Sequence, residues 1–157
     1  MKNRYINFAI AIVFIWIGFV CSISFMEAWL KFRAPGVTTE IGLGVGQLVF
    51  TALNRVEITC AILIILSLVF SKSGNVFALF RIYFFITLII LSVQTFWLLP
   101  ILHQRADLRI EGLDVPRSNV HLWYVMIEII KVITLFIYGV KLLNAIIGSK
   151  NKIHIQT

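Results

Sequence analysis

The chain has 157 residues, of which 60% are hydrophobic and 13% are charged, and its formal net charge is +7. A soluble domain is typically about half apolar and about a quarter charged, so the composition indicates a membrane protein rather than a soluble one. The basic residues flank apolar spans and do not interleave with aromatic residues, so we expect contact with lipid headgroups and no binding of nucleic acid.

Four apolar stretches predict four membrane helices, because a bilayer core about 30 Å thick needs roughly 20 apolar residues per helix. The expected helices cover residues 6–30, 45–70, 77–102 and 119–143. Together they would use nearly the whole chain. We therefore expect an all-α fold, a polytopic four-helix bundle in one domain over residues 1–147, followed by a mobile polar tail over residues 148–157.

The first apolar run resembles a signal peptide, but it is longer than the usual 7–15 apolar residues and no A-x-A cleavage site follows it. We interpret it as a retained first helix. The dipeptide Pro35-Gly36 then predicts a turn.

Local signals predict how the other helices begin and end. Gly42 and Gly46 lie in the glycine-rich approach to the second helix and are four residues apart, which favours close helix packing. Pro100 is expected to end or kink the third helix, and a charged loop is expected over residues 103–118. Ser118 or Asn119 is a suitable N-cap for the fourth helix.

The distribution of basic residues predicts the orientation in the membrane. One side of the predicted topology carries basic residues and no acidic residue, namely Lys2, Arg4, Lys72, Arg81, Lys141, Lys150 and Lys152. The other side carries basic and acidic residues together. We therefore expect both termini to be cytoplasmic, in a bacterial inner (plasma) membrane. Trp29, Trp97 and Trp123 would then lie toward the outer interface, and Trp16 is expected at an interface or in packing.

Four charged residues fall well inside the apolar spans: Arg55, Glu57, Glu128 and Lys131. A charge at the bilayer centre costs on the order of 3 kcal/mol on insertion scales, so such residues usually face a protein interior and mark a functional site. These four residues are the strongest functional signal in the sequence.

Helical periodicity places further polar residues near these charges. At about 100° per residue, His121, Tyr124, Glu128 and Lys131 fall on one face of the fourth helix. The other helices supply polar residues at similar depth. We expect one interior site in the outer half of the bundle, with its ligand- or proton-binding residues drawn from Glu57, Glu128, His121, Arg55, Lys131, Glu27, Asn54, Gln94 and Tyr124.

The simplest pairing of the charges is Arg55 with Glu128 and Glu57 with Lys131, or the reverse, so that they sum to zero. A structural ion-pair network and a proton-coupled site would both have that balance. In a functional site, Glu57 and Glu128 would titrate or bind the ligand. Arg55 and Lys131 would hold the charge state of these two carboxylates, and His121 would gate the outer mouth of the site.

Three functions remain open from the residues. The first is binding or transfer of a small polar solute, ion or proton. The second is an accessory or interaction subunit of a larger membrane complex, whose intramembrane charges pair with a partner. The chain is short for a transporter acting alone, so a homo-oligomer or a larger membrane protein partner is expected in either case.

The third function is a membrane-embedded metal or redox enzyme. Glu27, Glu57, His121 and Glu128 could form a carboxylate-rich metal site, but the chain lacks the Glu-x-x-His pairs of di-iron bundles. No nucleophile and base form a known motif, so an enzyme is not favoured. No cofactor is assigned.

Three stretches of the first two helices carry a resemblance: SFMEAWLKFRAP (24–35), GLGVGQLVF (42–50) and LNRVE (53–57). They resemble small four-helix bacterial integral membrane proteins of uncharacterised function. The resemblance implies a bacterial inner-membrane location and no established activity.

Overall fold

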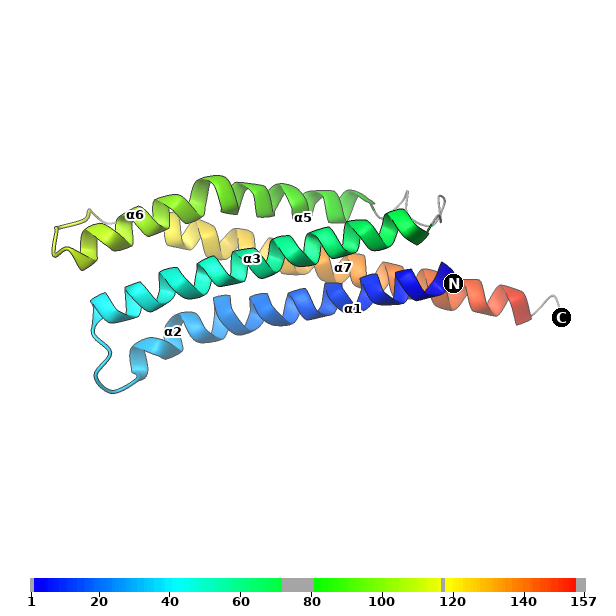
Figure 1. Cartoon of the computed structure of the whole chain (residues 1–157), viewed down its shortest axis with the longest axis horizontal. Coiled ribbons are helices and arrows are strands. Elements are labelled where there is room, and N and C mark those ends of the chain that lie inside the picture. The colour runs from blue at the N-terminus through cyan, green and yellow to red at the C-terminus, as the bar shows by residue number, and fades with distance from the viewer. Residues whose placement is uncertain (1, 72–80, 117, 155–157) are drawn as a thin grey trace.

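The computed structural model describes residues 2–71, 81–116 and 118–154, and these form long helical rods lying side by side along one axis (Figure 1). Among these described residues there is no β-strand. The fold class predicted from composition and hydropathy, an all-α four-helix bundle, is confirmed.

Each rod is one long helical segment, and two of the rods contain a π-helical stretch. The first rod consists of α1 (Lys2–Val20), a π-helix (Cys21–Glu27), α2 (Ala28–Leu30) and a 3-10 turn (Lys31–Arg33). The second rod is α3 (Thr39–Ser71). The third consists of α5 (Arg81–Val93), a π-helix (Gln94–Leu98) and α6 (Leu99–Ile110), and the fourth is α7 (Val120–His154).

All four rods are long and apolar enough to cross a membrane. The spanning stretches are Arg4–Arg33, Thr39–Ser71, Ile82–Ile110 and Val120–Gly148. A helix satisfies its own backbone hydrogen bonds, which is what a segment in hydrocarbon requires. The chain is therefore a multi-pass membrane protein.

The second helix begins at Thr39, earlier than expected, and so includes Gly42 as well as Gly46. These glycines allow close packing, as predicted, but against side chains of the first rod. A Cβ on Gly42 would overlap the Phe32 ring, and one on Gly46 would lie 2.8 Å from Lys31 Nζ. Gly36 has φ 81°, in keeping with the predicted turn.

Pro100 does not end the third rod, and α6 continues through part of the expected loop to Ile110. Proline cannot donate a backbone hydrogen bond, and its ring crowds the carbonyl four residues earlier. The π-helical turn just before it, in which the Leu99 N–H bonds to Gln94 O, widens the helix there. Pro100 then occupies the first turn of α6, where an N–H is not needed.

This junction is also where the third rod changes its neighbour. α5 packs mainly against α7, whereas α6 packs mainly against α3. α6 and α7 are consequently only weakly packed at that end of the bundle.

The fourth helix begins where its capping residues predict. The Val120 N–H donates to Ser118 Oγ at 3.2 Å. The helix runs beyond the predicted end, as far as His154. A mobile tail over residues 148–157 stays a prediction, and residues 155–157 lie outside the described chain. The predicted start of the third helix at residue 77 also lies outside it.

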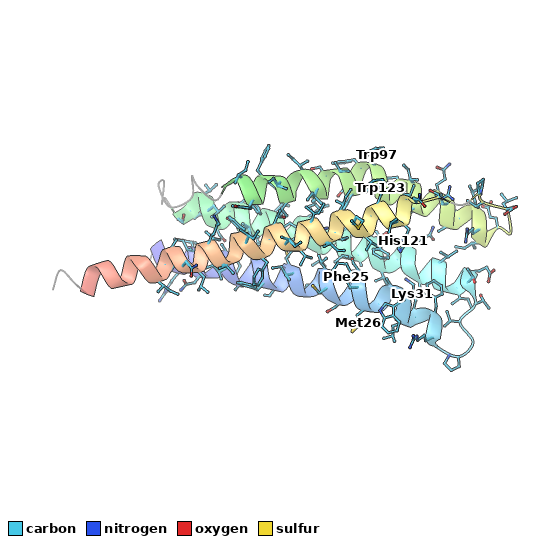
Figure 2. The ribbon with its side chains drawn as sticks, turned by 180° about the vertical axis from the view of Figure 1, so that it is seen from behind. Phe25, Met26, Lys31, Trp97, His121 and Trp123 are labelled. Atoms are coloured by element: carbon cyan, nitrogen blue, oxygen red, sulfur yellow. The ribbon has the colours of Figure 1, made fainter. Side chains whose placement is uncertain are left out.

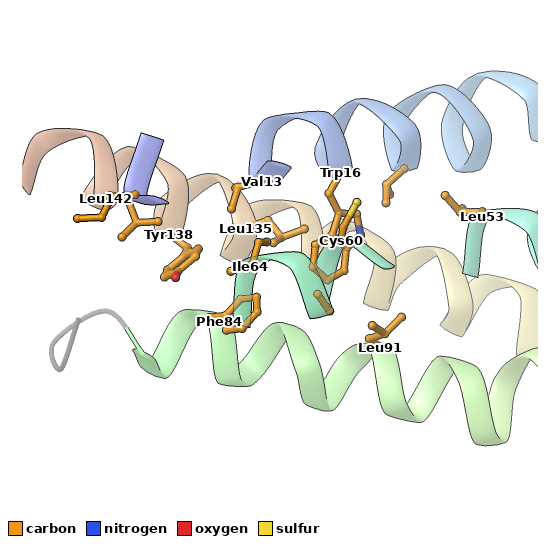
Figure 3. Close-up of a cluster of buried hydrophobic side chains, with 13 residues drawn as sticks. Val13, Trp16, Leu53, Cys60, Ile64, Phe84, Leu91, Leu135, Tyr138 and Leu142 are labelled. Carbon is orange, nitrogen blue, oxygen red and sulfur yellow. The ribbon is translucent and has the colours of Figure 1, made fainter. Parts of the chain in front are cut away.

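One half of the bundle has an apolar core to which all four rods contribute (Figure 3). Its side chains include Val13, Ile64, Leu135 and Leu142, and it contains a stacked pair of rings. We call this half, with α5 and the N-terminal part of α1, the apolar half. The half with α2 and α6 is the polar half.

Candidate functional site

Lys131 forms the centre of a buried cluster of polar side chains in the polar half. Its ammonium pairs with the Glu57 carboxylate of α3 and lies 2.9 Å from Glu128 Oε2 on its own helix. It also donates to Gln94 Oε1 at 2.7 Å. All three charged side chains have no exposed surface.

The first rod completes this cluster with two neutral donors. The Trp16 indole N–H donates to Glu57 Oε1 at 2.8 Å. The Ser24 hydroxyl donates to Glu128 Oε1 at 3.3 Å. All four rods therefore contribute to one site, which we call the polar cluster: Trp16, Ser24, Glu57, Gln94, Glu128 and Lys131.

Local geometry explains how each rod places its residue. Glu128 and Lys131 are three residues apart on α7 and so lie on the same face. Gln94 is the first residue of the π-helical turn, and its side chain is buried. A further bond, from Asn54 Nδ2 to Thr95 Oγ1 at 2.7 Å, joins α3 to that turn beside the cluster.

The charges of the cluster are unequal. Among the described residues one ammonium, that of Lys131, faces two buried carboxylates. Glu57 Oε2 has no hydrogen-bond partner, and neither has the amide nitrogen of Gln94. The cluster therefore has one formal negative charge that the described residues do not compensate, and a buried charge is costly unless it is paired.

Arg55 does not take part, and the predicted pairing of Arg55 with Glu57 or Glu128 is wrong. Its side chain lies on the exposed face of α3, and no ion pair joins it to any acidic side chain in the described part of the chain. Residues two apart on a helix point in nearly opposite directions. Packing Glu57 inward therefore turns Arg55 outward, and the interior charges do not sum to zero.

The structure separates the remaining predicted site residues into two groups. Tyr124 lies beside Glu128, one turn earlier on α7, and is buried. Asn54 lies next to the cluster through Thr95. Glu27 and His121 are not in it: Glu27 pairs with Lys31 at 3.3 Å, and His121 lines a separate cavity nearer the end of the bundle.

Two members of the cluster were not predicted as site residues. Ser24 shares a helix face with Glu27, but a single hydroxyl in an apolar span does not indicate an interior site as a charged group does. Trp16 was expected at an interface or in packing. The sequence did carry a signal, because Trp16 lies near the middle of the first apolar span, where an interfacial tryptophan has no place.

The metal-site hypothesis gains no support from the geometry. In the described ranges, no three or more His, Cys, Asp or Glu side chains gather closely enough to hold a metal ion. Glu57 and Glu128 are held by Lys131, while Glu27 and His121 lie elsewhere. Cys21 and Cys60 are free thiols.

A cavity of about 280 Å³ lies between the polar cluster and the end of the bundle. Its polar lining comes from Lys31, Gln47, His103 and His121, and its apolar lining includes Phe50. The Phe50 ring meets the Tyr124 ring edge to face, with 5.5 Å between centroids. Phe50, in the wall of this cavity, is thus followed by Tyr124 and then by Glu128 on the way to the polar cluster. We call it the outer cavity, for its place near the end of the bundle.

Exposed tryptophans indicate the depth of these features. Trp97 and Trp123 are more than 60% exposed and lie in the same band across the bundle as Lys31 and His121 (Figure 2). Tryptophan is enriched at membrane–water interfaces. On this basis we place the outer cavity near the level of the headgroups and the polar cluster deeper in the membrane.

No family model matches the chain, and neither a curated protein nor a solved structure matches it. The resemblance of residues 24–57 to small four-helix bacterial membrane proteins thus has no family match behind it. The four long apolar helices agree with a small helical membrane protein.

Proposed function

We propose that this protein binds a proton, or another small cation, at the polar cluster and exchanges it with the outer cavity. We place it in the inner membrane of a bacterium with both termini in the cytoplasm, on the basis of its basic residues and its resemblance. The outer cavity would then face the periplasmic or external side.

The observation that supports this proposal is the charge of the cluster. One buried ammonium for two buried carboxylates leaves room for one added positive charge in the described site. In a low-dielectric interior an uncompensated charge is far more costly than in water, so the neutral, proton- or cation-loaded state is the stable one. A purely structural network would be expected to balance itself.

We propose a role for each residue from its contacts. Glu57 presents the unpartnered Oε2 and is the acceptor of the added charge. Lys131 holds the two carboxylates together, and Gln94 positions Lys131. Glu128 is the carboxylate closest to the outer cavity, because Tyr124 contacts it and Phe50 contacts Tyr124.

The apolar half limits what this site can do. On that side of the cluster most of the described core is apolar, with Ile64, Leu91 and Leu135 among its side chains. Its buried hydroxyls include those of Thr87 and Thr134, which lie 3.0 Å apart. Protons move along hydrogen-bonded groups, and such a core offers few. We therefore propose binding and release from the outer side, with passage across the membrane needing helix movement or a partner.

Infrared difference spectroscopy tests the proposal. Purified protein in lipid is titrated between pH 5 and 8, and the parent is compared with Glu57→Gln and Glu128→Gln. We expect a titrating carboxyl band that disappears in one of the two variants. Glu40→Gln, at the exposed start of α3, is the matched control. If both folded cluster variants keep the parent spectrum, the cluster is a structural ion-pair network.

Thiol labelling tests the orientation. In a variant lacking Cys21 and Cys60, a cysteine at Gly112 should react with an impermeant reagent added to intact cells. A cysteine at Gly148, at the other end of the bundle, should react only after permeabilisation. The opposite pattern would place the outer cavity on the cytoplasmic side.

A second candidate function, an accessory subunit, is favoured by Arg55. This arginine lies on the outer face of α3, and the neighbouring exposed side chains on that helix include Leu48, Ile58 and Ile62. A cation on a lipid-facing surface usually has a partner or extends to the headgroups. A helix of another membrane protein that presents a carboxylate at this depth would satisfy it.

Replacing Arg55 by leucine distinguishes an arginine that pairs with a partner carboxylate from one that faces only lipid. If a partner carboxylate pairs with Arg55, Arg55→Leu should abolish co-migration of the partner on native gels. If Arg55 faces only lipid, the variant should migrate like the parent and be at least as stable. Ile58→Leu, one turn away on the same helix, is the control.

A further inference from the structure

The outer cavity continues into a second hollow of about 280 Å³ on the α6 and α7 side. The two share Leu43, Leu102, Ala106 and His121 in their walls. We call the combined depression the outer groove. It exists because α6 packs against α3 and leaves α7 at this end of the bundle.

The second hollow brings basic side chains to one end of the groove. Arg105 and Arg109 of α6 line it, together with Ser118 and His121 at the start of α7. The Arg105 guanidinium donates to the Pro116 carbonyl, which holds the guanidinium at the groove wall.

No carboxylate of the described chain lines either part of the groove. The nearest acidic side chain on α6, Asp107, accepts a bond from Gln47 Nε2 at 2.7 Å. Glu27, on the first rod, is paired with Lys31. The groove therefore presents positive charge with no acidic side chain in its lining to compete for it, and this favours an anionic ligand.

The deeper part of the groove has a different character. Its walls are mainly apolar, with Phe32, Leu43, Phe50 and Leu102 among them. A small inorganic anion would leave this part empty, whereas an acyl chain would fill it. The groove thus matches a molecule with an anionic head and an apolar tail.

The position of the groove identifies the source of such a molecule. Arg105 and Arg109 follow Trp97 by 8 and 12 residues on the same rod and so lie nearer its end. The inner part of the groove, with Lys31 and His121, lies in the band of the bundle that contains the exposed Trp97 and Trp123 (Figure 2). This is the level at which lipid phosphates meet the upper part of their acyl chains. Basic pockets between membrane helices are known to bind anionic headgroups.

We propose that the outer groove binds one anionic phospholipid. Its phosphate lies against Arg105, Arg109 and the hydroxyl of Ser118, and His121 contacts the headgroup from α7. One acyl chain extends between α3, α6 and α7 toward Phe50. This site is separate from the polar cluster, and it can be present whether or not the cluster takes up a proton.

Native mass spectrometry of the full chain in a neutral detergent tests this proposal. The protein is titrated with phosphatidylglycerol or phosphatidylcholine of the same chain length. We expect one phosphatidylglycerol to bind with a preference of several fold over phosphatidylcholine. Arg109→Gln should weaken that binding about fivefold, which is the typical effect of one basic residue near an anionic surface.

Arg33→Gln is the matched control, because Arg33 lies at the same end of the bundle but outside the groove, over the Trp29 ring. It should leave the affinity unchanged. Ala106→Phe, at a buried position that lines both hollows, should block the path of the acyl chain and abolish binding of phosphatidylglycerol. If Ala106→Phe fails to fold, the comparison of Arg109→Gln with Arg33→Gln still decides the matter.

Three results would overturn the proposal. Equal affinity for the two lipids would show that the groove does not distinguish an anionic headgroup from a zwitterionic one. Equal loss in Arg109→Gln and Arg33→Gln would place the lipid elsewhere on the basic surface. Full displacement of phosphatidylglycerol by millimolar glycerol phosphate would show a site for free anions without a role for the apolar walls.

Discussion

The two halves of the bundle are held together by different forces. In the apolar half the helices meet through shape, with Phe84 stacked on Tyr138 at 5.2 Å between ring centroids. In the polar half they meet through charge, with Lys131 joining two carboxylates and an amide. Lipid chains are as apolar as the core, so helix association gains little from the hydrophobic effect, and packing and hydrogen bonds must supply it.

The difference shows what each half is suited to do. An apolar core fitted by shape is neutral and needs nothing more. The polar cluster has a charge that its own residues do not balance, and it lies below a cavity at the headgroup level. Under the proposed function, stability and proton or cation binding compete in the polar half, and substitutions in the two halves should separate these contributions.

The largest effect is expected for Lys131→Met, which leaves two carboxylates buried without a cation. Breaking a buried ion pair by removing one partner typically costs about 3–5 kcal/mol. Thermal unfolding in detergent should show a large loss of stability. Lys31→Met is the control, since its partly exposed pair with Glu27 contributes at most about 1 kcal/mol. Equal losses of stability for the two substitutions would contradict the burial of the polar cluster away from water.

Leu135→Ala tests the apolar half. Leu135 is fully buried in the core, and truncating it leaves a cavity among tightly packed side chains. We expect a loss of about 2 kcal/mol, at the low end of the range for buried leucines. Ile133→Ala, which faces outward on the same helix, should have a much smaller effect. If both variants unfold alike, shape does not hold this half together.

Trp16→Phe tests the connection between the halves, because Trp16 packs in the apolar core and donates to Glu57. The substitution keeps a six-membered aromatic ring, removes the N–H and leaves a small void at a fully buried position. A hydrogen bond to a charged group contributes about 1.5 kcal/mol or slightly more. The part of the loss that is due to the hydrogen bond should vanish in a Glu57→Leu background, which has no acceptor for the indole N–H, and any loss that persists there is due to packing.

The smallest effect is expected for Thr87→Val. The Thr87 and Thr134 hydroxyls are 3.0 Å apart and join α5 to α7 within the apolar half. Hydrogen bonds between membrane helices contribute about 0.6 kcal/mol on average, so the free energy of unfolding should decrease only slightly. Thr59→Val, where the hydroxyl bonds to its own helix, is the matched control. A loss as large as that of Lys131→Met would mean that the apolar half also depends on polar contacts.

The sequence by itself determined the number and type of the elements. A backbone in hydrocarbon must satisfy its own hydrogen bonds, so four apolar runs of sufficient length predict four helices. The sequence also indicated Glu57, Glu128 and Lys131 as interior residues, because charges inside such runs are costly unless they are buried. These inferences depend only on local composition and on the thickness of a bilayer.

Only the tertiary structure decided which charges meet. Periodicity fixes the angle between residues on one helix, but the rotation and offset of each helix follow from packing against its neighbours. That packing turned Arg55 outward, gave Lys131 two carboxylates and brought Trp16 to Glu57 across 41 positions of the chain. It also let the third rod pass Pro100 by a π-helical turn and leave α7, which opened the outer groove.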